Sequence, residues 1–147
     1  MRAVHWFRND LRLTDNTALT LAARADALVP LFILDDGLLG GAHRSPARQR
    51  FLFDCLQRLA ADLAAQGCPL IVRRGDPVEV IARLLHETRA DRLTFNRDYS
   101  PYARRRDAAV AARATAAGVR VEACKDRVVF EHGEVRKQDG GDFVVYT

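Results

Sequence analysis

A cluster of charged and amide side chains follows the hydrophobic start of the chain, in the stretch HWFRNDLRLTDN at residues 5–16. Arg8, Asn9, Asp10 and Arg12 can make charge-assisted hydrogen bonds, which are strong contacts for fixing a polar ligand. The stretch contains no glycine, although a loop that cradles a phosphate with its backbone normally needs glycine for the close approach. We therefore expect any ligand held here to be gripped by side chains.

Two further segments carry polar side chains directly after apolar stretches. Residues 35–48 follow ALVPLFIL, and residues 96–99 follow a short apolar stretch at 92–95. In an open parallel sheet, ligands bind beyond the carboxyl ends of the strands, near the point where the strand order reverses. We expect these two segments and residues 8–12 to lie side by side there and to share a cleft.

Common nucleotide-binding and catalytic motifs are absent from the sequence. There is no G-x-G-x-x-G, no G-x-x-x-x-G-K-[ST], no H-E-x-x-H and no nucleophile elbow, which disfavours a dinucleotide dehydrogenase, a P-loop enzyme and a serine hydrolase. The histidines lack metal-ligand spacing, so we expect no metal site. Cys55, Cys68 and Cys124 fit neither a disulfide framework nor a zinc site, and we expect them to be buried as small apolar residues.

The hydrophobic pattern alternates between five short strands and four helices. Strands are expected at residues 3–7, 27–34, 69–73, 92–95 and 119–123. Ser-Pro or Asp-Pro pairs at 45–46, 76–77 and 100–101 are typical of a helix N-cap followed by proline, and Thr14 or Asp15 can cap an earlier helix. This alternation predicts a doubly wound α/β domain, with a five-stranded parallel sheet in the order 3-2-1-4-5 and helices on both faces.

The length of 147 residues fits a single domain, for which residues 1–124 supply the α/β unit. Residues 125–147 lose the helical rhythm and are expected to be an extension that starts a linker, with short strands at 128–130 and 143–146 around a turn at 139–141. No apolar run approaches the ~20 residues of a membrane span, and no signal segment opens the chain. We expect a cytoplasmic protein with no membrane partner.

Several blocks of the sequence resemble the DNA photolyases and cryptochromes. They are HWFRNDLRLTDNTAL, SPARQRFLFDCLQRLAADLAAQG, RRGDP and FNRDYSPYARRRD, and their order and spacing agree with that family over practically the whole chain. The resemblance implies the N-terminal α/β domain, which in many photolyases carries an antenna chromophore: a folate, a deazaflavin or FMN. Holding such a ring in a fixed orientation requires a largely apolar pocket with a few polar groups, and no acid, base or nucleophile.

The same resemblance implies a second, helical domain outside these 147 residues. In the family, that domain binds FAD, contacts the pyrimidine dimer in damaged DNA and carries out the electron transfer that splits it. We therefore expect part of a deoxyribodipyrimidine photolyase whose antenna passes excitation to FAD, and no catalysis by this chain alone. Two alternatives remain open: part of a cryptochrome blue-light receptor, and a free-standing nucleotide-binding module.

The resemblance also implies which loop positions line the chromophore pocket. They are Arg8, Asp10, Leu34, Asp35, Pro46, Arg48, Asn96, Arg97 and Asp98. Phe32, Ile33 and Leu34 could form an apolar wall at the end of the second strand. Ser100 departs from a Tyr-Glu-Pro-Tyr pattern found in many relatives, which puts in doubt a contact made there by a carboxylate.

Purely structural interpretations compete with several of these assignments. The charged side chains of residues 8–15 could form an ion-pair cluster that stiffens the loop or meets the helical domain. Trp6 lies in an apolar strand, which favours a core position. The arginines at 104–106 point to different faces of a helix, which favours a solvated surface over a DNA contact. Tyr99 and Tyr102 are expected to pack against the preceding strand.

Overall fold

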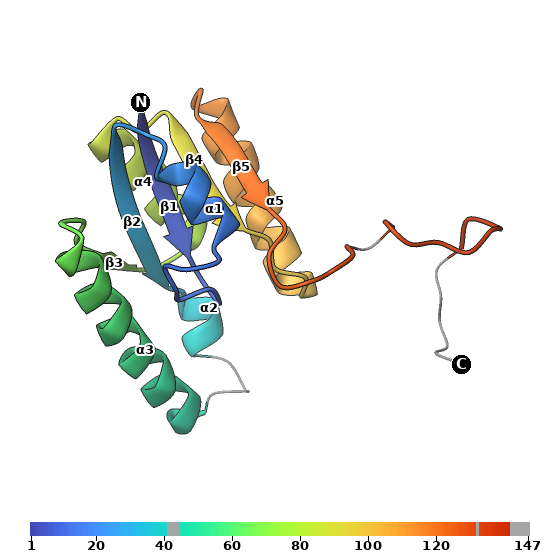
Figure 1. The fold of residues 1–147 in the computed structure, drawn as a ribbon, viewed down its shortest axis with the longest axis horizontal. Coiled ribbons are helices and arrows are strands. Elements are labelled where there is room, and N and C mark those ends of the chain that lie inside the picture. The colour runs from blue at the N-terminus through green and yellow to red at the C-terminus, as the bar shows by residue number, and fades with distance from the viewer. Residues whose placement is uncertain (41–44, 132, 142–147) are drawn as a thin grey trace.

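One parallel sheet forms the centre of the molecule in the computed structural model, which describes residues 1–40, 45–131 and 133–141. Its strands are β1 (Arg2–Phe7), β2 (Ala27–Leu34), β3 (Ile71–Arg74), β4 (Arg92–Asn96) and β5 (Arg120–Cys124). They pair in the order β3-β2-β1-β4-β5, and every pairing is parallel (Figure 1). The predicted fold class and strand order are confirmed.

Within the described residues, five helices connect the strands, where the sequence predicted four. They are α1 (Thr17–Ala22), α2 (Asp36–Leu39), α3 (Pro46–Ala65), α4 (Pro77–Thr88) and α5 (Pro101–Ala116). Ser45, Asp76 and Ser100 cap the last three helices as predicted, each followed by proline. The additional helix, α2, is a single turn that Asp35 caps by accepting a hydrogen bond from Gly37 N at 2.9 Å.

The cap of α1 differs from the prediction. Asn16 is the N-cap, and its side-chain oxygen accepts a hydrogen bond from Leu19 N at 3.0 Å. Asp15 has a φ of 51°, whereas an N-cap residue takes an extended conformation. The left-handed turn at Asp15 therefore moves the start of the helix one residue beyond the predicted caps.

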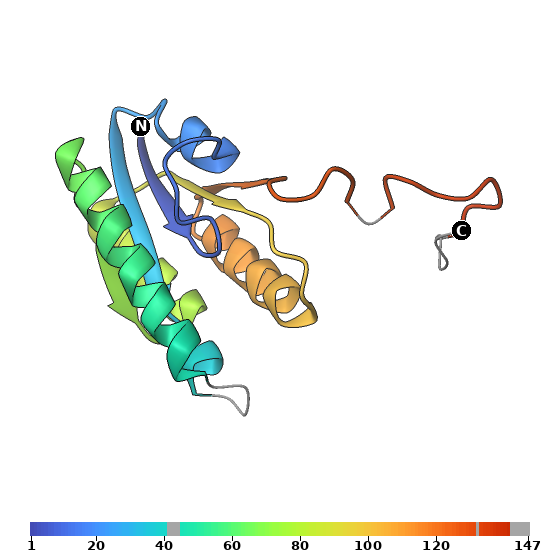
Figure 2. The same ribbon diagram turned by 60° about the horizontal axis from the view of Figure 1, so that its bottom comes forward.

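Two apolar clusters lie on opposite faces of the sheet. One contains Val4, Trp6 and Phe95 from the strands with buried residues of α4 and α5. The other contains Phe7 and Phe32 with buried residues of α1 and α3. The sheet is thus covered on both faces, as Figures 1 and 2 show. Because neighbouring residues of a strand point to opposite faces, Trp6 and Phe7 belong to different clusters.

The three cysteines are free and half-buried, so the expectation of full burial was wrong. Cys55 lies in the middle of α3, Cys68 lies just beyond the end of that helix, and Cys124 ends the outer strand β5. No helix in the described ranges is long and apolar enough to cross a bilayer.

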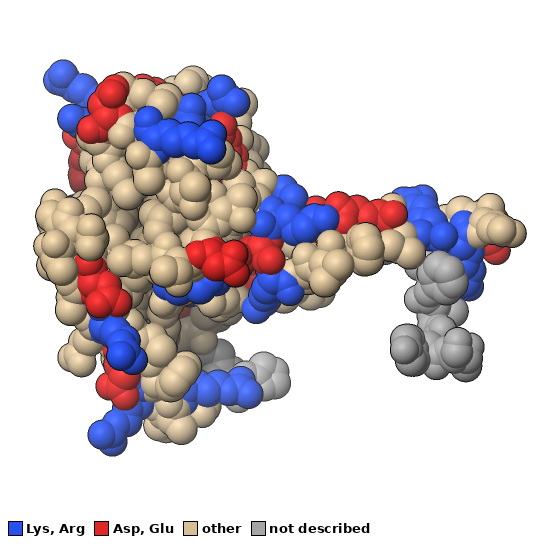
Figure 3. All heavy atoms as spheres, viewed as in Figure 1, with Lys and Arg blue, Asp and Glu red and all other residues tan. Residues whose placement is uncertain are grey.

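Beyond β5, the described residues run away from the sheet as an extended segment (Figures 1 and 2). The strand predicted at 128–130 is absent: these residues pair with no strand, and Val129 and Phe130 are 80% and 64% exposed. The turn predicted near Asp139 is present, with Gly140 N donating to Lys137 O at 2.9 Å. The strand expected at 143–146 lies outside the described residues. Acidic and basic side chains follow one another along this segment in Figure 3.

Candidate functional site

A cavity of about 250 Å³ opens at the carboxyl edge of the sheet, where the loops after β1, β2 and β4 meet. We call it the edge cavity. Phe32, Ile33, Leu38 and Leu52 supply most of its apolar lining. Its polar lining comes from Arg8, Asn9, Asp35, Asp98 and Arg106. An apolar wall with a few converging polar groups is the usual composition of a site for a small organic molecule.

Two shallower hollows adjoin the same edge. One, of about 390 Å³, shares Arg8, Asn9 and Leu52 with the edge cavity and adds residues of the β1 loop and α3. The other, of about 530 Å³, contains Leu34 and lies between α2, α3 and the end of β3. The first hollow extends the edge cavity along α3, so a ligand larger than a single ring system has room there.

Arg8 is held rigidly at the floor of this region. Its guanidinium forms an ion pair with Asp107 of α5 and donates a hydrogen bond to the backbone oxygen of Asn96. The same group lies 4.7 Å from the centre of the Trp6 ring and 4.9 Å from that of Phe95. Burial lowers the pKa of Arg8. These contacts fix Arg8 between two loops and a helix. Its side chain therefore shapes the site and has little freedom to move with a ligand.

A buried amide network joins the β1 and β4 loops. Asn96 donates to Asp10 Oδ2 at 2.6 Å and to Asn16 Oδ1 at 2.8 Å, and its oxygen accepts from Ala18 N at 3.2 Å. Asp10 also accepts a hydrogen bond from the backbone N–H of Arg8 at 2.8 Å. The polar atoms of Asp10 and Asn96 are thus engaged inside the protein, and neither residue lines the edge cavity.

Asp35 and Tyr102 form a second polar pair beside the cavity. The Tyr102 hydroxyl donates to Asp35 Oδ2 at 2.7 Å. Burial and this hydrogen bond raise the pKa of Tyr102 to about 12. A side chain at Gly37 would approach the Tyr102 hydroxyl to 2.8 Å, which is below normal contact distance. The glycine therefore allows α2 to lie against α5, and this contact positions Asp35 at the cavity wall.

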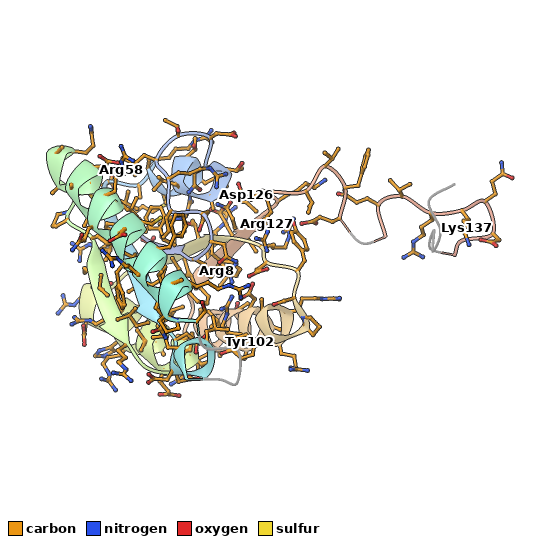
Figure 4. The ribbon with its side chains drawn as sticks, turned by 90° about the horizontal axis from the view of Figure 1, so that it is seen from below. Arg8, Arg58, Tyr102, Asp126, Arg127 and Lys137 are labelled. Atoms are coloured by element: carbon orange, nitrogen blue, oxygen red, sulfur yellow. The ribbon has the colours of Figure 1, made fainter. Side chains whose placement is uncertain are left out.

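The extended segment is anchored across the β1 and β4 loops. Arg12 pairs with Asp126 at 2.5 Å, and Arg127 pairs with Asp98 at 2.7 Å. Figure 4 shows Arg8, Asp126 and Arg127 gathered at this edge, with Lys137 far out on the segment. The hollow that Arg8, Asp126 and Arg127 share with Asp98 has a volume of only about 10 Å³. The ion pairs fill the space between the β1 and β4 loops next to the extended segment. They leave the edge cavity beside α2 and α3 open.

Arg97 belongs to this anchor and not to the edge cavity. It forms an ion pair with Glu131 at 2.6 Å, and Tyr99 donates to the same carboxylate at 2.8 Å. Hydrogen bonding to Glu131 raises the pKa of Arg97, and the same contact lowers the pKa of Glu131. Tyr99 thus packs over its own loop and the extended segment, and the phenol does not face the cavity lining.

Of the nine predicted pocket residues, the structure brings three to the edge cavity: Arg8, Asp35 and Asp98. Leu34 lines the hollow beside α2. Pro46 and Arg48 are exposed in the first turn of α3 and line none of these spaces. Asp10, Asn96 and Arg97 serve the loop contacts described above.

Several cavity residues were missed or assigned another role. Trp6 is 2% exposed, as predicted for the core, yet it also belongs to the cavity lining. The prediction of a solvated arginine row was wrong for Arg106, whose side chain is only 8% exposed. Its guanidinium lies 4.9 Å from the centre of the Trp6 ring. Arg106 lies on the inward face of α5, one turn after the inward-facing Ala103 and one before Val110. This spacing in the sequence could have indicated its burial.

Comparison with known proteins places this architecture in a family. The family model described as DNA photolyase matches residues 3–147. The chain belongs to the DNA photolyase family. Among photolyase-family relatives, a deoxyribodipyrimidine photo-lyase from Synechococcus sp. is 36% identical over 142 residues, covering 96% of this chain and 29% of that protein. Cryptochrome-1 of Mus musculus is 37% identical over 142 residues, covering 96% of this chain and 23% of that protein.

Solved photolyase structures share the fold. A bacterial class III photolyase from Agrobacterium tumefaciens superposes with a TM-score of 0.89 at 28% identity, covering 99% of this chain and 30% of that one. An archaeal photolyase from Sulfolobus tokodaii, described as holding two FAD molecules with the implication of a novel light-harvesting cofactor, gives 0.82 at 29% identity, covering 90% of this chain and 32% of that one. The chain spans less than a third of the length of the relatives that it matches.

Proposed function

We propose that this domain binds a light-harvesting chromophore in the edge cavity and forms the N-terminal part of a DNA photolyase. The observation that carries the proposal is the position and composition of that cavity. It lies at the carboxyl edge of a doubly wound sheet, with an apolar wall from β2, α2 and α3, a polar rim from Asp35 and Asp98, and Arg8 at its floor. This arrangement suits a planar ring with polar substituents at its edge.

Each part of the cavity has a distinct role in the proposal. Ile33, Leu38 and Leu52 contact the faces of the ring and exclude water, while Asp35 and Asp98 accept hydrogen bonds from groups at its edge. Arg8 and Trp6 form a rigid floor, because the arginine is fixed by Asp107 and by the backbone of Asn96. A rigid floor supports an antenna role, since a fixed ring orientation is what transfer of excitation to a second chromophore needs.

The acceptor of that excitation would be FAD in a helical domain of the whole protein. We propose that this larger protein repairs pyrimidine dimers in damaged DNA, and that the present chain contributes light capture without catalysis. Cryptochrome relatives match as well as photolyase relatives do, at 37% and 36% identity. A light receptor without repair activity is therefore the second candidate. Light-dependent repair of a dimer-containing oligonucleotide by the whole protein distinguishes the two.

Chromophore titrations of the 147-residue chain test the antenna proposal directly. The chain is mixed in turn with FMN, 8-hydroxy-5-deazaflavin and 5,10-methenyltetrahydrofolate, and binding is followed by absorbance and fluorescence anisotropy. We expect saturable binding of at least one of them, and none of AMP. Binding of AMP alone would favour a nucleotide-binding module, and failure of all three chromophores to bind would overturn the antenna role.

A matched pair of variants connects binding to the edge cavity. Leu38→Glu places a carboxylate on the apolar wall at a position that is 58% exposed, so folding should be retained. Val129→Glu makes the same change at an 80% exposed position on the extended segment. We expect the first variant to weaken chromophore binding by about tenfold or more, because an unpaired charge must be desolvated by the ring. The second should bind as the unmodified chain does.

A further inference from the structure

A second, largely apolar space adjoins the edge cavity along α3. It has a volume of about 390 Å³, and we call it the α3 hollow. Arg8, Asn9 and Leu52 line both spaces, so the two meet at these residues. A ligand seated in the edge cavity therefore has room to extend a substituent into the α3 hollow. The rest of its lining consists of Leu11, Arg12, Phe51 and Cys55.

Phe51 gives the α3 hollow an exposed aromatic surface. It is 71% exposed, the largest value of any aromatic residue in the described ranges. It belongs to neither of the two apolar clusters that cover the sheet. Aromatic side chains favour contact with other rings, and covering their surface removes apolar area from water. A flat substituent lying on Phe51 and Leu52 would gain both contributions.

The polar side chains of the α3 hollow already have partners within the protein. Arg8 is held by the contacts described above. Asn9 donates to Asp98 Oδ2 at 2.8 Å, and Arg12 pairs with Asp126 at 2.5 Å. A polyhydroxyl chain lying here would lose hydrogen bonds to water and find few partners in return, which costs free energy. An aromatic substituent has no such loss.

We propose that the α3 hollow is a second subsite of the chromophore site and binds an aryl substituent of the ligand against Phe51 and Leu52. This inference rests on the proposed antenna function and narrows its ligand class. Flavin and deazaflavin chromophores carry a ribityl chain, whereas the folate carries a p-aminobenzoyl group. The folate is therefore the candidate that uses both spaces, with its ring system in the edge cavity and its aryl group on Phe51.

The test combines two ligands with two variants of the 147-residue chain. 5,10-Methenyltetrahydrofolate carries the aryl group, and 6-methyltetrahydropterin carries a reduced pterin ring without it. Phe51→Ser removes the aromatic surface at an exposed position, so folding should be retained. Phe53→Ser is the matched control, because Phe53 is 46% exposed on the same helix and lines the hollow beside α2 instead.

The two variants should differ with the aryl ligand only. We expect Phe51→Ser to weaken binding of methenyltetrahydrofolate by about tenfold, as for loss of an aromatic contact and its buried area. Binding of the methylpterin should be unchanged, because this ligand does not reach the α3 hollow. Phe53→Ser should bind both ligands as the unmodified chain does. If Phe51→Ser weakens both ligands equally, or neither, the subsite is wrong and the antenna role still stands.

Alkylation of Cys55 reports on occupancy of the α3 hollow without a variant. This free thiol is half-buried in the lining, whereas Cys68 is beyond the end of α3 and lines neither space. Saturating methenyltetrahydrofolate should slow the reaction of Cys55 with iodoacetamide several-fold and leave that of Cys68 unchanged, as read by peptide mass spectrometry. The methylpterin should protect neither thiol. Unprotected Cys55 in the folate complex would also overturn the subsite.

Two further results would assign the α3 hollow to something else. Tighter binding of FMN or 8-hydroxy-5-deazaflavin than of the folate would mean that the hollow does not select the ligand. Self-association of the unmodified chain that Phe51→Ser abolishes, measured by sedimentation velocity, would assign the hollow to a second copy of the chain. Either result overturns the proposal. If the chain binds none of the three chromophores, the antenna role and the subsite fail together.

Discussion

Single side chains at the carboxyl edge serve either the loops or the cavity. Asp10, Asn16 and Asn96 turn their polar atoms toward one another and hold the loops after β1 and β4 in register. Asp35, Asp98 and Arg106 line the edge cavity. Because both groups contain aspartates from loops at the ends of strands, residue type alone does not separate them. Burial and hydrogen-bond partners do.

Asn96→Ala should destabilise the domain strongly. The substitution removes the hydrogen bonds to Asp10 and Asn16 and leaves the buried carboxylate of Asp10 short of a donor. We expect the free energy of unfolding to fall by about 3 kcal/mol, the cost of leaving buried polar groups unpaired. Urea denaturation followed by circular dichroism measures it. As the control, Asn9→Ala removes an exposed hydrogen bond to Asp98 and should lower the free energy of unfolding by less than about 1 kcal/mol. Equal losses in the two variants would contradict the structural role assigned to Asn96.

His5 should make the stability of the domain depend on pH in the weakly acidic range. Burial lowers the pKa of His5 to about 4, and Nδ1 lies 2.8 Å from Thr94 Oγ1. As the pH falls below about 6.5, the unfolded chain takes up a proton that the folded state does not accept until about pH 4. The folded state therefore loses about 3 kcal/mol across this window and no more below it.

Urea denaturation at several pH values, compared with His5→Gln, isolates this contribution. The glutamine variant has no group that titrates at this position, so its stability should fall less steeply between pH 6.5 and 4. Carboxylates elsewhere contribute equally to both proteins. The same pH dependence in the two proteins would show that His5 already accepts a proton in the folded state.

Helices and strands were the most predictable level of this molecule. Alternating apolar strands, and the Ser-Pro and Asp-Pro starts of α3, α4 and α5, each depend on neighbouring residues in the chain, so the sequence indicates them directly. The single turn of α2 lies against α5, where the Tyr102 hydroxyl donates to its cap residue Asp35. The burial of Arg106 depends on Trp6 of β1. Contacts of this kind join residues that are far apart in the sequence, so no pattern among neighbouring residues predicts them.

The anchored segment after β5 should detach locally without unfolding the domain. Glu131→Ala removes the partner of Arg97 and Tyr99. We expect trypsin to cleave after Arg127 several times faster in this variant, because local opening exposes the backbone to protease. The free energy of unfolding should change by less than about 1 kcal/mol, as for other partly exposed ion pairs.

Asp139→Ala supplies the control for this proteolysis experiment. Its carboxylate accepts a hydrogen bond from Gly141 N at 2.9 Å in the distal turn and makes no contact with the sheet loops. Cleavage after Arg127 should proceed as in the unmodified chain, with rates read by mass spectrometry. Equal cleavage of both variants would mean that Glu131 does not anchor the segment.

At the scale of the whole molecule, the described part of the extended segment adds no residue to the apolar core. The two apolar clusters draw their buried members from residues between Val4 and Val119. Residues after Cys124 contribute ion pairs and hydrogen bonds, such as those of Asp126 and Arg127, but no buried apolar side chain among those described. This division is consistent with a domain boundary at residue 124, which remains a prediction.

Truncation after Cys124 tests this boundary. We expect the shortened chain to unfold in a single cooperative transition, with a loss of about 1–2 kcal/mol from the missing ion pairs. Guanidinium denaturation measures the loss, and Asp126→Ala in the 147-residue chain shows how much of it comes from the Arg12 pair. A broad, non-cooperative transition would place the boundary further along the chain.

The central position of β1 affects how the chain can be assembled during translation. Of the strands in this sheet, β1 is synthesised first and lies in the middle, and its second neighbour is β4, with Ala3 opposite Arg92. One edge of β1 therefore stays unpaired until roughly two thirds of the chain has been synthesised, a delay that favours slow folding and exposes hydrogen-bonding groups to other nascent chains. Expression at lower temperature, or with chaperones that shield strand edges, should raise the yield of folded protein for this reason.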